Sequence, residues 1–105
     1  MLCADMVEVA WVDQAGQPRS YTGLLEDICS TGACVQMDVP VPVETNVRVQ
    51  CGKTVLEGVV RYCIFREIGY FAGIEFGEGS RWSRERFEPQ HLLDLATLIP
   101  RQKPN

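Results

Sequence analysis

Residues 26–35, EDICSTGACV, bring two acids, two thiols, two hydroxyls and a glycine together within a chain of 105 residues. A carboxylate accepts hydrogen bonds, a thiol is a weak donor and acceptor, and glycine lets the backbone turn and approach another group closely. Asp27, Cys29 and Gly32 are therefore candidates for a ligand-binding turn. The alternative is an ordinary bend between two strands, in which Asp27 caps the turn through its side chain and Gly32 supplies a positive φ.

The elements around this turn follow a period-two alternation of apolar and polar residues, which is typical of half-buried strands. In residues 6–12, for example, Val7, Val9 and Trp11 share one face, whereas in residues 19–28 neither face is uniformly apolar. The predicted strands are residues 6–12, 19–28, 33–37, 45–51, 54–65 and 70–76. Six strands joined mainly by short turns predict an all-β antiparallel barrel or sandwich.

The pattern changes after residue 77. Leu92, Leu95, Ala96 and Ile99 follow the i, i+3, i+4, i+7 spacing of an amphipathic helix. We therefore expect one domain over residues 1–105, with the barrel at about 5–77, a C-terminal helical segment at about 81–99 and a frayed tail at 100–105.

Composition excludes several classes of function. A net charge of −4 and a pI near 4.9 disfavour charge-driven binding to DNA, RNA or anionic membranes. No apolar run reaches the roughly 20 residues that span a bilayer, so membrane insertion is not expected. Five cysteines without a CxxC pair, with one histidine, indicate reduced thiols, no metal site and a cytoplasmic location.

The run GLLEDICSTGACVQM, a proline-bearing connection, and then TNVRV, EGVVRYC and YFAGIEF resemble the PilZ-domain family over about residues 5–77. The resemblance implies a six-stranded antiparallel barrel with a C-terminal helix and, as in many members, binding of cyclic di-GMP. Asp27, Cys29 and Gly32 match the spacing of the family motif, Asp or Asn, any residue, Ser, two residues, Gly. Cysteine replaces the serine, although Ser30 is adjacent, and this exchange should weaken a polar contact with the ligand.

A second family motif, RxxxR before the first strand, is absent, since MLCAD contains no basic residue and no two arginines in the chain are four apart. In relatives those arginines clamp phosphates and guanines, which suits their planar charged fork. The auxiliary candidates for charge and stacking are Arg19, Arg61, Arg81, Trp82 and Arg84. The alternative is that these arginines pair with nearby acids, such as Glu75, on a solvated surface.

The sequence therefore predicts a PilZ-like signalling module of the cyclic di-GMP effector family, with weak or absent nucleotide binding. The alternative is a ligand-independent adaptor domain that contacts a protein partner. No enzyme is expected, because GxSxG, HExxH, Walker and dinucleotide-binding motifs are all missing. No cofactor is expected apart from cyclic di-GMP as a ligand, and the oligomeric state stays open.

Overall fold

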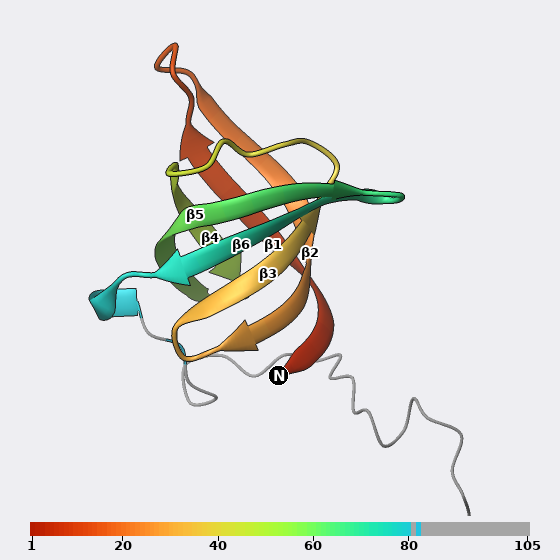
Figure 1. The fold of residues 1–105 in the computed structure, drawn as a ribbon. Coiled ribbons are helices and arrows are strands. Elements are labelled where there is room, and N and C mark those ends of the chain that lie inside the picture. The colour runs from red at the N-terminus through yellow and green to blue at the C-terminus, as the bar shows by residue number, and fades with distance from the viewer. Residues whose placement is uncertain (81, 83–105) are drawn as a thin grey trace, which may run out of the picture.

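A computed structural model describes residues 1–80 and Trp82. In this part the chain forms six strands and one 3₁₀ turn, and the strands close into an antiparallel barrel in the order β1-β2-β3-β6-β5-β4 (Figure 1). The elements are β1 Leu2–Val12, β2 Pro18–Cys29, β3 Gly32–Met37, β4 Asn46–Cys51, β5 Thr54–Arg66, β6 Gly69–Phe76 and η1 Glu78–Ser80. The predicted six-stranded all-β barrel is confirmed.

The barrel closes where β1 pairs with β4, through Val9 opposite Val49. Closure leaves no sheet edge in the body of the barrel, which removes the commonest route to strand-to-strand aggregation. The predicted inward face of β1 is confirmed, because Val7, Val9 and Trp11 are all buried. The largest fully buried side chains of the interior are Leu25, Ile28, Met37, Leu56, Val9, Val35, Val41, Val49, Val60, Cys3 and Cys51.

A β-bulge in β2 explains why its two faces were mixed in the sequence. Leu25 pairs with Val35 and Asp27 pairs with Cys34, so that Glu26 is an extra residue on β2. An extra residue moves every later side chain of the strand to the other face. Leu25 therefore points inward before the bulge and Ile28 points inward after it.

A second bulge lies in β5, where Val60 pairs with Ile74 and Tyr62 pairs with Gly73, leaving Arg61 as the extra residue. Beyond this bulge, β5 and β6 continue as a hairpin that projects from the barrel (Figure 1). We call residues 62–71 the β5–β6 arm. β4 pairs with β5 only as far as Val59, so the arm has no strand beside its β5 edge.

The C-terminal helix expected at about 81–99 and the tail at 100–105 lie outside the described residues, apart from Trp82. The Trp82 side chain is only 8% exposed and belongs to the hydrophobic core. No helix in residues 1–80 has the length and hydropathy to cross a membrane.

Candidate functional site

The turn between β2 and β3 consists of Ser30 and Thr31, because Cys29 opposite Gly32 is the last strand pair. Both turn carbonyls accept backbone hydrogen bonds from distant parts of the chain. Phe76, at the end of β6, donates its N–H to Thr31 at 2.8 Å, and Trp82 donates its N–H to Ser30 at 3.1 Å. These bonds hold the turn against β6 and against Trp82.

An open pocket of about 320 Å³ lies beside this turn, on the outer face of the barrel. Asp27, Cys29 and Gly32 line it together with Arg61 and Tyr62 of β5. The structure thus brings the three predicted turn residues and one predicted auxiliary arginine into one site. Its volume is near the lower end of the range for small-molecule pockets.

Tyr62 forms a wall of this pocket that sequence reasoning missed. Its ring lies over Gly73, and a Cβ atom built on Gly73 would be only 2.0 Å from Tyr62 Cε2. The absence of a side chain at Gly73 therefore lets the tyrosine ring lie close to the sheet. The phenol also interacts with Cys34, another residue that lines the pocket.

Gly32 does not adopt the positive φ that the bend interpretation predicted, so that prediction was wrong. The glycines with positive φ are Gly16, Gly52 and Gly69. Gly32 is required by space, because a Cβ atom there would lie 2.6 Å from the carbonyl oxygen of Ile74. A contact below 3.0 Å with backbone cannot be relieved by a side-chain rotation, so β3 and β6 approach closely only because residue 32 is glycine.

Asp27 also departs from the predicted turn cap. Its Oδ1 atom accepts a hydrogen bond of 2.8 Å from the Met1 ammonium group, which donates a second bond of 2.9 Å to the Ile28 carbonyl oxygen. The side chain therefore binds the start of β1 and forms no hydrogen bond within the turn in the described part of the chain. A guanine edge that bonds to both carboxylate oxygens would have to share Oδ1 with this ammonium group.

Cys29 is the exposed thiol of the pocket, and its Sγ atom lies 3.5 Å from the Thr31 hydroxyl oxygen. Hydrogen bonding from the Thr31 hydroxyl, and from the Thr31 and Gly32 backbone, lowers the pKa of Cys29. Burial acts in the opposite direction on three other thiols: it raises the pKa of Cys34, and it raises the pKa values of Cys3 and Cys51 to about 11. Cys29 should therefore carry the largest thiolate fraction of these four cysteines at neutral pH.

We expect iodoacetamide at pH 7.5 to alkylate Cys29 before Cys3, Cys34 and Cys51, because the thiolate is the nucleophile and Cys29 is exposed. Replacing Thr31 with valine removes the hydroxyl donor, so the midpoint pH of Cys29 labelling should rise and the rate at pH 7.5 should fall. Timed labelling followed by peptide mass spectrometry measures both. Ser20→Ala, which removes an exposed hydroxyl from another part of β2, is the control. Faster labelling of Cys34 than of Cys29 would contradict the assignment.

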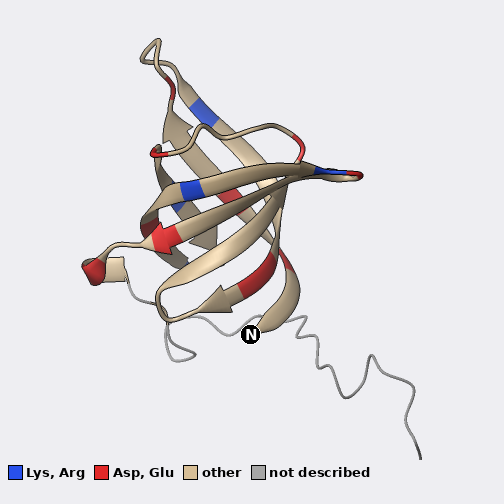
Figure 2. Ribbon diagram, viewed as in Figure 1, with Lys and Arg blue, Asp and Glu red and all other residues tan. Residues whose placement is uncertain are grey.

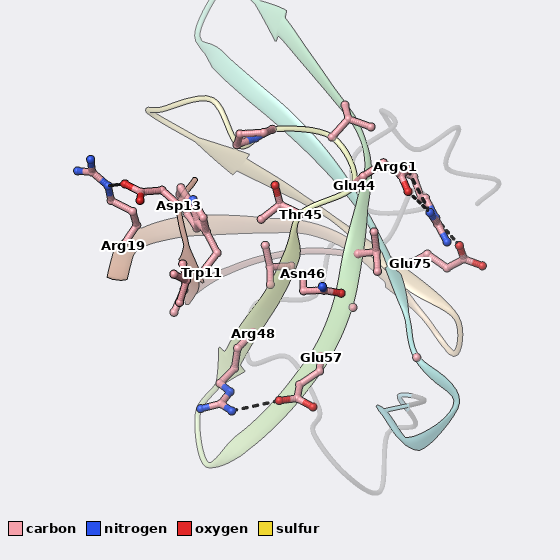
Figure 3. A pocket seen from close by; sticks show the side chains of 18 of the residues that line it. Trp11, Asp13, Arg19, Glu44, Thr45, Asn46, Arg48, Glu57, Arg61 and Glu75 are labelled. Carbon is pink, nitrogen blue, oxygen red and sulfur yellow. Dashed lines mark hydrogen bonds and ion pairs between the residues drawn. The ribbon is translucent and has the colours of Figure 1, made fainter. Parts of the chain in front are cut away.

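Arg61, which lines the pocket, already pairs with two acidic side chains. Arg61 Nε lies 2.7 Å from Glu75 Oε1, and Arg61 Nη1 lies 2.9 Å and 3.1 Å from the two carboxylate oxygens of Glu44. Figure 3 shows the guanidinium group between these two acids. The alternative interpretation, in which Arg61 pairs with surface acids, is therefore confirmed for this residue. A phosphate group that approaches this half-exposed guanidinium group would be repelled by the two carboxylates already paired with it.

Two further auxiliary residues, Arg19 and Trp82, do not line the pocket with Asp27, Cys29 and Gly32. Arg19 donates from Nε to Asp13 Oδ2 at 2.9 Å and lines a different, larger cavity of about 1240 Å³ (Figure 3). Trp82 is buried, so its ring is not exposed for stacking on a base. Arg81 and Arg84 lie outside the described residues.

The described residues 1–80 and Trp82 contain no group of three or more His, Cys, Asp or Glu side chains that could hold a metal ion. No family model matches the chain, no curated protein matches it, and no solved structure matches it.

Proposed function

We propose that the chain is a non-catalytic, PilZ-like signalling domain whose outer pocket binds cyclic di-GMP weakly or not at all. The observation that carries this proposal is the convergence of Asp27, Cys29, Gly32 and Arg61 on one pocket beside the β2–β3 turn. Asp27 offers an acceptor for the N–H edge of a guanine, and Arg61 offers the charge that a phosphate needs. All five cysteines are free, which suits a reducing, cytoplasmic location.

The electrostatics of the pocket support weak binding rather than tight binding. A cyclic dinucleotide carries two negative charges, but Arg61 is paired with both Glu44 and Glu75. Asp27 and Glu75 add negative charge to the lining, so acids outnumber the single arginine there. The cysteine in place of serine also contributes a weaker hydrogen bond than a hydroxyl group.

A ligand-independent adaptor is the second candidate function. It is favoured by the exposed apolar side chains that gather on the β5–β6 arm, namely Tyr62, Ile64, Phe65 and Ile68. Contiguous exposed apolar surface on a small domain marks a place of contact with another macromolecule.

Calorimetric titration of the full chain with cyclic di-GMP at moderate salt tests the nucleotide proposal. We expect either no measurable heat or a Kd no tighter than about 10 μM, which corresponds to about −7 kcal/mol. Any weak isotherm should disappear in Asp27→Ala and persist in Asp38→Ala, an exposed acid outside the pocket. A sub-micromolar isotherm that is lost in Asp27→Ala would contradict the expectation of weak binding.

A further inference from the structure

The β5 edge of the β5–β6 arm is a free strand edge. The neighbouring strand β4 ends its pairing at Val59. Val60 is still bonded, since it accepts from the Glu44 N–H at 2.7 Å and donates to the Thr45 carbonyl oxygen at 3.0 Å. Beyond Val60, within the part of the chain that the structure describes, the backbone of residues 62–66 forms hydrogen bonds only with β6.

This free edge is apolar on both faces of the arm. Ile64 is 45% exposed and lies opposite Phe71 on one face, whereas Phe65 is 63% exposed and lies opposite Tyr70 on the other. The Phe65 and Tyr70 rings are 5.0 Å apart. Proteins usually protect edge strands with charges, proline or short length. Residues 62–65 contain no charged residue and no proline, and the nearest charges are Arg61 and Arg66.

We propose that a second copy of this chain pairs with the arm, antiparallel and edge to edge, about a two-fold axis at Ile64. The free stretch is residues 62–66, because Val60 is already bonded, and Ile64 is its midpoint. A two-fold axis there uses every free residue of both copies. Each Ile64 then faces Ile64 of the other copy, and β3, β6 and β5 of both copies form one continuous sheet.

The register centred on Ile64 is self-complementary, as a two-fold interface requires. It places Tyr62 of one copy opposite Arg66 of the other and Cys63 opposite Phe65. The Arg66 guanidinium already lies over the Phe71 ring, 5.8 Å from its centroid, so it is positioned on the face that Tyr62 shares. Arg66 therefore meets an aromatic ring rather than a second arginine.

The charge of the chain does not oppose this contact. The net charge is −4, but the arm contains one base, Arg66, and one acid, Glu67. Within residues 1–80, the other acids lie on the barrel, its loops and η1 (Figure 2). Two arms can therefore approach without bringing the acidic surfaces together, whereas an unlike partner would need its own complementary apolar strand.

Sedimentation velocity of the full chain from about 1 to 500 μM tests the proposal. The mass should rise from 11.8 kDa toward twice that value. Ile64→Lys places two ammonium groups opposite each other at the axis, so we expect the dimer dissociation constant to rise at least about tenfold. Phe65→Lys should act similarly from the other face. Val12→Lys, the same change at an exposed apolar strand residue outside the arm, should leave self-association unchanged.

Circular dichroism is the check on folding, and each variant should keep the barrel because Ile64, Phe65 and Val12 are all exposed. A native chain that stays monomeric to about 500 μM would overturn the proposal. So would a dimer that tolerates both arm variants, or one that Val12→Lys weakens equally. Ile64 and Phe65 do not line the nucleotide pocket, so failure of the dimer and failure of the nucleotide titration are separate results.

Discussion

Replacing Leu25 with alanine is expected to lower the free energy of unfolding by about 2–5 kcal/mol, because a fully buried leucine leaves both lost burial and a cavity. Leu25 is 0% exposed, points into the barrel and precedes the β2 bulge. In a domain of this size each kcal/mol corresponds to roughly 4–8 °C in melting temperature. Thermal and urea unfolding followed by circular dichroism measure the change.

Leu24→Ala is the matched control, since it makes the same change one residue earlier. Leu24 is half-buried and lies on the outer face, opposite Met6 and Gln36. We expect it to cost less than about 1 kcal/mol. Equal losses in the two variants would show that β2 does not keep the orientation that places Leu25 inside.

Replacing Gly32 with alanine is expected to destabilise the chain by about 1–3 kcal/mol, the usual cost of forcing extra volume into a packed site. The new Cβ atom would lie 2.6 Å from the Ile74 carbonyl oxygen, so β3 and β6 must separate. The same melts measure this effect, and the β3–β6 amides should also lose protection from hydrogen exchange.

Gly79→Ala is the control for this substitution, because a Cβ atom at Gly79 meets nothing within 4 Å and Gly79 has no positive φ. It should change the melting temperature little. If Gly32→Ala were as harmless as Gly79→Ala, close strand approach could not be the reason for glycine at residue 32.

The strands were predictable from the sequence because alternation of apolar and polar residues reports directly on which face is buried. All six predicted strands are present, with ends that differ by a few residues. The largest difference is at β1, which begins at Leu2 rather than at residue 6. Asp5 is buried at an inward position, and a charged residue on the inward face hides the period from sequence reasoning.

The bulges were not predictable, because an inserted residue breaks the very period by which strands are recognised. In β2 this break showed only as two mixed faces. The candidate site was predictable to the extent that it is local, since Asp27, Cys29 and Gly32 are close in sequence. Tyr62 and Gly73 meet because of the register between β5 and β6, and Glu44 reaches Arg61 from the loop before β4. These residues are far apart in the sequence, so no local pattern indicates their contribution.

Arg61, the extra residue of the β5 bulge, lines both the turn pocket and the larger cavity. Its two carboxylate partners come from different places, Glu44 from the loop before β4 and Glu75 from β6. Any molecule that draws the guanidinium group into one cavity must remove it from the wall of the other. Two ligands that each bind Arg61, one in each cavity, would therefore be thermodynamically linked, and by reciprocity each would alter the affinity of the other by the same factor.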